Sequence, residues 1–409
     1  MKRILTLLLI VINLAAHGQK KNLAQTPPMG WNSWNYFGKP NVSEQLIVEV
    51  IDAIVANGLK EAGYNYVVVD GGWRDTALDA KGRLVANSKF PRGMKFLADY
   101  AHSKGLKFGL HIVPGSHDCG GDKVGGWGKE AVQMQQFNEW GIDFIKLDRC
   151  KFSLIENPDK RKKRSPQWYA GWRDTANLYK AYSTWAKLIK ENERDILYSA
   201  SVYKFYDWYP QLTNMGRTTG DINANCSGGA TFDDPDSKPH LSVMTIADRN
   251  NKWAAYAQPG YWNDPDMMVT GNKGLNIAQQ KAHFALWCIM SSPLFLGNDP
   301  RNMSPEEKAI ITNRDAIAVN QDATEQGIKI KKDGPAEIWA KRLKNGGYGV
   351  LLLNRDAKQT HKITLKAADL KIEDAKKIRD IYNKKELGSF NDFYQADVPP
   401  QSGLFLLIY

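Results

Sequence analysis

The sequence predicts an α/β protein, a (β/α)8 TIM barrel followed by a C-terminal antiparallel β-sandwich domain. Over residues 25–320, short apolar runs alternate with longer amphipathic stretches. This is the pattern of parallel strands that are buried on both faces and covered by helices. After about residue 325 the pattern changes to short alternating strands joined by turns. The 409 residues exceed the length of a barrel of about 250 residues and leave room for an appended domain.

The predicted barrel strands are short, rich in β-branched or aromatic residues, and followed by polar residues. They are Tyr64–Asp70, Lys107–Ile112, Asp143–Asp148, Ile196–Ser201 and Leu294–Gly297. Helical periodicity fills the intervals, at Gln45–Leu59, Gly93–His102, Ala131–Trp140 and Tyr179–Lys190. A doubly wound open sheet is the alternative, but no glycine-rich phosphate turn follows an early strand, as that fold would usually have.

The tail, residues 325–409, has the signature of a small β domain. Asn345-Gly346 separates two strand-like runs, which is a strong hairpin signal. The strand-like runs are Ile328–Ile330, Ala336–Leu343, Gly347–Leu353, His361–Leu365, Ala375–Tyr382 and Ser402–Tyr409.

Composition excludes several classes of protein. Hydrophobic residues make up 43% and charged residues 24%, which argues against disorder or a fibre. The formal charge of +11 suggests anionic partners, but the basic residues are scattered apart from the run Lys160–Arg164, which is typical of a solvated loop. We therefore expect no nucleic-acid partner. The 13 Trp and 17 Tyr favour an enzyme that handles sugars.

The first 18 residues have the layout of a secretory signal peptide. Lys2 and Arg3 precede an apolar run, Ile4–Ala16, and small residues follow at Ala16 and Gly18. The run is shorter than the about 20 residues that span a bilayer. An uncleaved anchor is the alternative. We expect export to the periplasm or the outside and no membrane span after cleavage; the sequence gives no oligomeric state.

In a barrel, functional side chains lie at the carboxyl ends of strands. This rule selects Trp34, Asp70, His111, Lys146, Asp148, Ser201, Asp221, Asp264 and Asp266. Aromatic faces that stack on sugar rings, together with carboxylates that bind hydroxyl groups, predict a carbohydrate site.

Asp148 is the leading candidate for a nucleophile. Lys146 lies two residues earlier, on the same face of the strand, and its charge would lower the pKa of Asp148 and keep it ionised. A structural salt bridge is the alternative. Asp221 is the candidate general acid, for which burial or an anion such as Asp148 would have to raise its pKa. The alternative is an ordinary turn aspartate after Gly220.

Other chemistries have little support. The pair Asp264 and Asp266 could suggest a metal site, but the chain has no EF-hand spacing and no HExxH. The polar stretch Asp233–Asp236 is interpreted as a loop, and no GxSxG supports a serine nucleophile. The four cysteines allow three connectivities, and their spacing does not choose among them.

Several segments, in order along the chain, resemble the α-galactosidases of glycoside hydrolase family 27, in clan D. They are Thr26–Trp34, Phe108–His111, Trp140–Cys150, Arg217–Asp221, Trp262–Met267 and Ser292–Asp299. The resemblance covers nearly the whole chain after the signal segment. It implies the same two-domain fold, no metal or organic cofactor, and a retaining mechanism with two aspartates.

The resemblance also implies roles for single residues. Asp148 matches the nucleophile and Asp221 the acid/base. Cys119 and Cys150 match a disulfide beside the site, whereas Cys226 and Cys288 have no assigned partner. Sugar-binding roles carry over to Trp34, Asp70, Lys146, Arg217 and Asp266, and the strand-end rule adds His111 and Asp264.

The chain departs from the family pattern in the sugar pocket. Gly71 and Gly72 follow Asp70, where the family usually has a second Asp and then a Cys. His111 replaces a usual Tyr, and the segment Ser201–Phe205 replaces an acidic and aromatic pair. Losing a carboxylate that binds a hydroxyl group can change which sugar is accepted.

We therefore expect a retaining exo-glycosidase that hydrolyses terminal α-galactosyl residues from oligosaccharides or polysaccharides by a two-Asp double displacement. One alternative is the same mechanism on β-L-arabinopyranosides or α-N-acetylgalactosaminides. A non-catalytic carbohydrate-binding barrel is the other, and the presence of both Asp148 and Asp221 argues against it.

Overall fold

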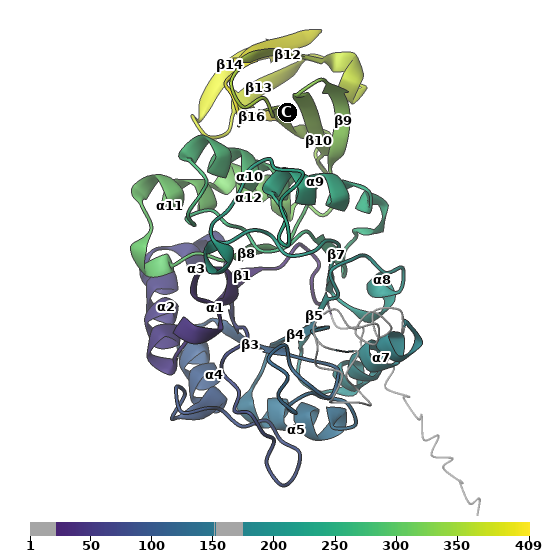
Figure 1. The fold of residues 1–409 in the computed structure, drawn as a ribbon. Helices are drawn as coiled ribbons and strands as arrows, with labels where there is room; N and C mark the ends of the chain where they lie inside the picture. The colour runs from purple at the N-terminus through teal and green to yellow at the C-terminus, as the bar shows by residue number, and fades with distance from the viewer. Residues whose placement is uncertain (1–21, 151, 153–174) are drawn as a thin grey trace, which may run out of the picture.

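The structure is a computed structural model that describes residues 22–150, 152 and 175–409. The predicted signal peptide and the basic run Lys160–Arg164 lie outside these residues. The chain forms a ring of strands surrounded by helices, with a second domain attached at one side (Figure 1).

The ring is one eight-stranded sheet in the order β7-β6-β5-β4-β3-β2-β1-β8, and every neighbouring pair in it is parallel. The strands are β1 (Met29–Asn32), β2 (Tyr66–Val69), β3 (Lys107–Ile112), β4 (Phe144–Asp148), β5 (Leu197–Ser201), β6 (Met215–Arg217), β7 (Trp262–Asp264) and β8 (Leu294–Leu296). Nearly all their residues are buried, which explains their continuous apolar runs. The predicted barrel is confirmed and the open doubly wound sheet is wrong, because β1 pairs with both β2 and β8.

The ring closes between β7 and β8 by a single bridge. Met268, which follows β7, pairs with Leu296. Its amide donates to the carbonyl of Phe295 at 2.8 Å, and its carbonyl accepts from the amide of Gly297 at 3.0 Å. The seam of the barrel is therefore formed by the segment that follows β7.

Amphipathic helices cover the outside of the ring (Figure 1). The principal ones are α2 (Glu44–Ala56), α4 (Gly93–Ser103), α5 (Glu130–Trp140), α7 (Thr175–Glu191), α9 (Val243–Asn251), α10 (Ile277–Ile289) and α12 (Arg314–Gln321). In α2, Ser43 caps the first turn by accepting from the Leu46 amide, and the buried face follows the helical period at Ile47, Val50 and Ile54. No helix in the described part of the chain is long and apolar enough to cross a membrane.

The C-terminal domain is a β-sandwich. One sheet has the order β14-β13-β16-β11-β10-β9, and the strands β12 and β15 form a second, two-stranded sheet. The strands are β9 (Ile328–Asp333), β10 (Ala336–Arg342), β11 (Tyr348–Asn354), β12 (His361–Lys366), β13 (Lys376–Asp380), β14 (Lys385–Phe390), β15 (Phe393–Val398) and β16 (Ser402–Ile408). The predicted hairpin joins β10 to β11, and Gly346 has the positive φ of +79° that this turn requires.

The two domains share one hydrophobic core. Helix α10 lies between them and is buried on all sides from Ala282 to Ile289, which explains its lack of a polar face. Side chains of the sandwich that face the barrel, including Trp339, Leu351 and Phe405, belong to the same core cluster as the barrel. The two domains therefore pack as a unit.

A charged cluster crosses the same interface. The Arg355 guanidinium binds the carboxylates of Asp233 and Asp248 from the barrel side, at 2.7 and 2.8 Å, and Glu337 at 3.1 Å. Lys329 also binds Asp248 and, at 2.7 Å, Glu337, which is fully buried. The loop predicted at Asp233–Asp236 thus has a partner in the second domain.

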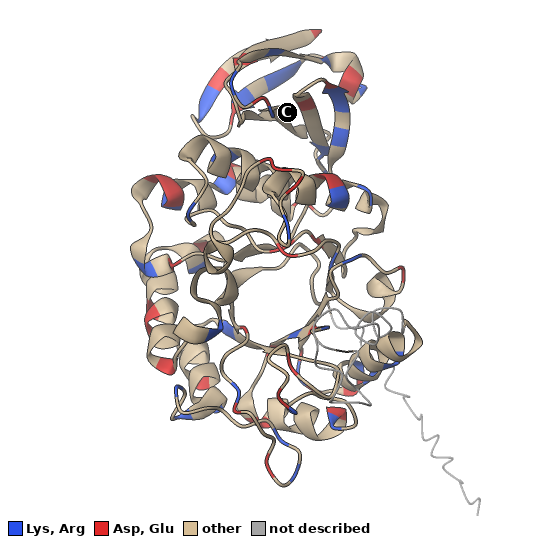
Figure 2. Cartoon of the chain, viewed as in Figure 1, with Lys and Arg blue, Asp and Glu red and all other residues tan. Residues whose placement is uncertain are grey.

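Lys and Arg are interspersed with Asp and Glu over both domains in the view of Figure 2. The excess positive charge of the sequence forms no single basic patch in this view, which agrees with the interpretation that it carries little information about a partner.

Candidate active site

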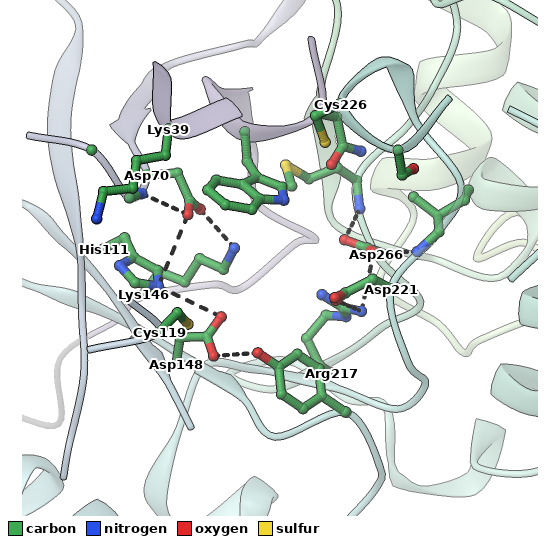
Figure 3. A pocket seen from close by; sticks show the side chains of 18 of the residues that line it. Lys39, Asp70, His111, Cys119, Lys146, Asp148, Arg217, Asp221, Cys226 and Asp266 are labelled. Atoms are coloured by element: carbon green, nitrogen blue, oxygen red, sulfur yellow. Dashed lines mark hydrogen bonds and ion pairs between the residues drawn. The ribbon is translucent and has the colours of Figure 1, made fainter. Parts of the chain in front are cut away.

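The candidate site is a cavity of about 150 Å³ at the carboxyl ends of the barrel strands (Figure 3). Its volume is below the about 300–1,000 Å³ of pockets for drug-sized ligands, which suits one small polar unit. Its walls include Trp34, Asp70, His111, Lys146, Asp148, Tyr203, Arg217, Asp221 and Asp266. The strand-end rule therefore brings together most of the residues that the sequence selected.

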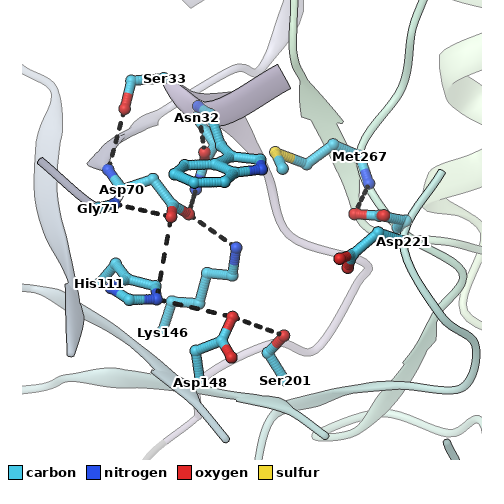
Figure 4. Close-up of polar contacts among 12 residues, drawn as sticks. Asn32, Ser33, Asp70, Gly71, His111, Lys146, Asp148, Ser201, Asp221 and Met267 are labelled. Atoms are coloured by element: carbon cyan, nitrogen blue, oxygen red, sulfur yellow. Dashed lines mark hydrogen bonds and ion pairs between the residues drawn. The ribbon is translucent and has the colours of Figure 1, made fainter. Parts of the chain in front are cut away.

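Asp70 follows β2 and is held by donors on both carboxylate oxygens (Figure 4). Lys146 Nζ and Asn32 Nδ2 donate to Oδ2 at 2.7 and 3.0 Å, and the Gly71 amide donates to Oδ1 at 2.8 Å. Burial disfavours the charge, but the nearby Lys146 ammonium outweighs it and holds the pKa of Asp70 well below its usual range. The same pairing raises the pKa of Lys146 above its usual range. The two side chains form a fixed acceptor and donor pair that can bind sugar hydroxyl groups.

Asp148 is the last residue of β4 and is buried. Its Oδ1 accepts from Tyr203 Oη at 2.5 Å and from the Cys150 amide at 3.0 Å, and its Oδ2 accepts from Ser201 Oγ at 3.3 Å. Burial opposes ionisation, but the contact with His111, the charge of Lys146 and the Tyr203 hydroxyl together lower the pKa of Asp148 to about 2. The carboxylate is therefore ionised at neutral pH.

The prediction that the charge of Lys146 lowers the pKa of Asp148 is supported, but the hydrogen bond of Lys146 goes elsewhere. The Lys146 ammonium hydrogen-bonds Asp70 on the neighbouring wall, so it acts on Asp148 only through space. Neutral donors bind the Asp148 carboxylate instead. The reason is that the Asp70 carboxylate lies within reach of the same lysine and competes for it.

His111 lies between the two carboxylates (Figure 4). Its Nε2 is 3.9 Å from Asp70 Oδ1 and 3.6 Å from Asp148 Oδ2, both longer than a hydrogen bond. Its backbone carbonyl accepts from Trp73 Nε1 and from Arg74, each at 3.2 Å. His111 therefore lines the pocket at a fixed position at the end of β3.

Arg217, the last residue of β6, joins two carboxylates on the opposite wall. One of its terminal nitrogens is 3.1 Å from Asp221 Oδ1 and 3.0 Å from Asp266 Oδ2. The Asp221 side chain is 43% exposed, whereas that of Asp266 is 4% exposed. Burial and the carboxylates of Asp221 and Asp264 raise the pKa of Asp266 to about 6, although Arg217 opposes the shift.

Two details of the sequence prediction change here. Asp221 lies in the loop after β6, four residues beyond its last residue, not at the strand end itself. Its bound charged partner is Arg217, and it lies at the exposed side of the cavity rather than buried against Asp148. This exposed position gives Asp221 access to incoming and leaving groups.

Asp264 does not line the cavity, contrary to its prediction as a sugar-binding residue. It ends β7 and is buried, and its Oδ1 accepts from the Asp266 amide at 2.9 Å. The chain turns sharply at Asp266, where φ is +117°, so that only the second carboxylate of the pair points into the pocket.

The structure contains the disulfide between Cys119 and Cys150. It links the loop after β3 to the residue whose amide binds Asp148. Cys226 is a free thiol in the wall of the cavity, and Cys288 is free and buried in α10. Among the described residues, His111, Asp148 and Cys150 present possible metal-ligand atoms within 4.8 Å of one another. The disulfide occupies the Cys150 sulfur, which leaves too few ligands for an ordinary metal site.

Tyr203 is the functional residue that sequence reasoning missed. It lies two residues beyond β5 in a left-handed conformation, with φ of +64°, and donates the shortest of the hydrogen bonds to Asp148. The strand-end rule selected Ser201, but alternation along a strand says nothing about a residue after the strand has ended. The available signal was the position of this tyrosine just after β5, the strand that ends at the candidate Ser201.

Comparison with known proteins identifies the family of the chain. A family model described as "Alpha galactosidase A" matches residues 26–322, and one described as "Alpha galactosidase C-terminal beta sandwich domain" matches residues 333–408. The chain is 36% identical to alpha-galactosidase 2 of Arabidopsis thaliana, over 89% of this chain and 83% of the relative. It is 39% identical to alpha-galactosidase A of Cellvibrio japonicus, over 85% of this chain and 80% of the relative.

Solved structures agree as well. Alpha-galactosidase I from Mortierella vinacea superposes with a TM-score of 0.84 at 31% identity, covering 95% of this chain and 98% of that one. The two family models together cover both domains, and the relatives match over most of the chain. The chain therefore belongs to the α-galactosidase family, glycoside hydrolase family 27.

Proposed function

We propose that this protein is a retaining exo-acting α-galactosidase that removes terminal α-galactosyl units from oligosaccharides or polysaccharides. The observation that carries the proposal is the pair of opposed carboxylates, an ionised and buried Asp148 and an exposed Asp221 bound to Arg217. The small cavity, open to solvent at the side of Asp221, supports the removal of a terminal sugar unit.

The reaction follows from the two positions. The Asp148 carboxylate attacks C1 of the sugar while Asp221, in its acid form, protonates the departing glycosidic oxygen. Water then enters from the exposed side, where Asp221 takes its proton, and attacks C1 to free the enzyme. Asp70, Lys146, Arg217 and Asp266 would bind hydroxyl groups, and Trp34 would stack on the sugar face.

A panel of nitrophenyl glycosides tests the proposal. The purified protein is offered α-galactoside, β-L-arabinopyranoside and α-N-acetylgalactosaminide, and the anomer of the released sugar is followed by NMR. We expect the α-galactoside to be hydrolysed with the highest kcat/KM and the α-anomer to appear first. Saturable sugar binding without turnover of any substrate would overturn the proposal in favour of a binding protein.

Single carboxylate replacements test the roles. Asp148→Ala is expected to lower kcat by at least about 10⁴-fold because it removes the carboxylate that forms the covalent intermediate. Asp221→Ala should slow substrates with poor leaving groups far more than activated aryl glycosides, which need little proton donation. Asp236→Ala, in an exposed loop, is the matched control and should change neither. Equal activity of Asp148→Ala would refute the nucleophile assignment.

We also propose export, which rests on the charged and apolar pattern of residues 1–18. Expression of the full chain in its host, followed by fractionation and N-terminal sequencing, tests this. A start near residue 19 in the periplasmic or outside fraction is expected, and an intact N-terminus in the cytoplasm would overturn it.

A further inference from the structure

The two oxygens of the Asp148 carboxylate have unequal surroundings. Oδ1 accepts from Tyr203 Oη at 2.5 Å and from the Cys150 amide at 3.0 Å, whereas from the residues that the structure describes Oδ2 accepts one long bond, of 3.3 Å, from Ser201 Oγ. We propose that Tyr203 is a positioning residue that fixes Oδ1, so that Oδ2 is the attacking oxygen, and that it speeds the release of the sugar from the enzyme. The inference rests on the proposed retaining function.

Counting lone pairs assigns the attacking oxygen. A carboxylate oxygen has two lone pairs in the plane of the group, and on Oδ1 both are engaged by donors. On Oδ2 one lone pair has no donor among the described residues, and the Ser201 hydroxyl that engages the other can rotate away. His111 Nε2, at 3.6 Å, lies on the Oδ2 side without a hydrogen bond. Oδ2 therefore has an electron pair available to bond to C1.

The position of Tyr203 is set by its surroundings. Its backbone is left-handed, which aims the side chain back at β4 and the cavity wall. Its ring lies beside the Arg217 guanidinium, whose central carbon is 5.9 Å from the ring centre. Burial raises the pKa of the Tyr203 hydroxyl well above 10, so it stays protonated and acts as a donor at any working pH.

The hydrogen bond has different strengths along the reaction. In the first step Oδ2 bonds to C1, the bond from C1 to the glycosidic oxygen breaks, and Asp221 supplies the proton; Oδ1 becomes the carbonyl oxygen of an ester. In the second step water bonds to C1, Asp221 takes its proton, and the C1–Oδ2 bond breaks with its electron pair returned to the carboxylate. A donor on Oδ1 binds the carboxylate more strongly than the ester carbonyl, because one partner is then ionised.

Tyr203 therefore favours the second step, in which charge returns to Asp148. The Tyr203 hydroxyl does not accelerate the first step, because negative charge leaves Asp148 in that step. Removing the hydroxyl should slow release of the sugar by about 10- to 100-fold, the value of a hydrogen bond to a charged group. The first step, measured by kcat/KM, should change by less than about threefold.

The test compares Tyr203→Phe with a matched control, Tyr182→Phe. Tyr182 is fully buried and its hydroxyl donates at 2.9 Å to the carbonyl of Leu147, so the control removes the same group one residue from Asp148 without touching the carboxylate. With a dinitrophenyl α-galactoside, Tyr203→Phe is expected to lower kcat and KM together, to show a burst of dinitrophenol, and to accumulate a glycosyl-enzyme visible by intact mass spectrometry. Tyr182→Phe should show none of these changes.

Three results would overturn the inference. They are unchanged kinetics in Tyr203→Phe, a fall in kcat with constant KM and no burst, and the same burst in Tyr182→Phe. An inactive wild-type protein would overturn the proposed function and this inference together, whereas an active wild type with an unaffected Tyr203→Phe would overturn the inference alone.

A second variant keeps the test independent of folding. Incorporation of 3-fluorotyrosine at residue 203 retains the ring and makes the hydroxyl a stronger donor. It should raise the rate of sugar release, opposite in sign to Tyr203→Phe. A rate that stays the same or falls would count against the inference.

Discussion

Each carboxylate in the cavity has a different kind of partner, and this difference suits different roles. Asp70 is bound by a full positive charge on Lys146, which suits a permanent hydroxyl acceptor. Asp148 is bound by neutral donors, which leave its charge available for bonding to carbon. Asp221 shares Arg217 with Asp266 and remains partly exposed, which suits a group that exchanges protons with water.

Asp266 gives the protein a pH-dependent stability. Its pKa is raised from 3.8 to about 6 by burial and by the carboxylates of Asp221 and Asp264. Between these pH values the folded protein binds more protons at this site than the unfolded chain does. The contribution of Asp266 to the free energy of unfolding is therefore largest at acidic pH and falls as pH rises from about 4 to about 6.

Replacing Asp266 with Asn should remove this fall. Urea unfolding of the wild type and of Asp266→Asn at several pH values between 4 and 7 measures the fall. As pH rises, the unfolding free energy of Asp266→Asn should increase relative to that of the wild type. A difference that is constant over this range would contradict the assignment.

At the level of elements, the Cys119–Cys150 disulfide ties the loop after β3 to the chain just beyond Asp148, the proposed nucleophile. The disulfide joins residues 31 apart in sequence and fixes Cys150, whose amide donates to Asp148. The cross-link restricts the unfolded chain, which is worth about 3–4 kcal/mol for a loop of this length.

The double replacement Cys119→Ser and Cys150→Ser should lower the free energy of unfolding by about 3 kcal/mol. It should also lower kcat, because the amide of residue 150 is no longer held against Asp148. Cys226→Ser, which removes a free thiol, is the control for stability. A stable double variant with full activity would show that the loops hold their positions without the bond.

The sequence predicted the strands that have a clear apolar run, β2 to β5 and β8, and missed β1, β6 and β7. Strands β2 to β5 have four to six residues and a clear apolar run, so their carboxyl ends located Asp70, His111 and Asp148. Strands β6 and β7 have three residues each, too few for a periodic pattern. In the sandwich, β14 and β15 are largely exposed and polar, and they gave no apolar signal.

The hydrogen-bond pairings that the sequence missed within the site share a physical cause. Spacing along one strand placed Lys146 beside Asp148, but hydrogen bonds across the barrel depend on which side chains project from neighbouring strands. Lys146, on β4, donates to Asp70, which follows β2. Tyr203, in the loop after β5, donates to Asp148, which ends β4. Such pairings follow from the three-dimensional register and have no counterpart in a single segment of sequence.

For the whole molecule, the charged cluster around Arg355 joins the two domains. Glu337 is fully buried and relies on Lys329 and Arg355, and Arg355 also neutralises Asp233 and Asp248. Removing one member of a buried charged cluster leaves the others without compensation, which is more costly than losing an exposed pair.

Arg355→Ala should therefore lower the free energy of unfolding by about 3 kcal/mol. Arg342→Ala is the control, because Arg342 is exposed and lies 3.7 Å from an exposed Glu325, and its effect should be within about 1 kcal/mol. Chemical denaturation followed by tryptophan fluorescence measures both. Equal effects of the two replacements would show that the interface cluster contributes no more than a surface ion pair.

The single bridge that closes the barrel has a consequence for the cavity. The segment from Asp266 to Met268 both contributes to the cavity and joins the two ends of the sheet. Arg217 meets Asp266 across the neighbouring strands β6 and β7, whereas Trp34 and Asp70, which follow β1 and β2, line the same cavity from the other end of the sheet order. The complete pocket therefore requires a closed ring, because an open sheet would separate the residues after β1 and β2 from those after β6 and β7.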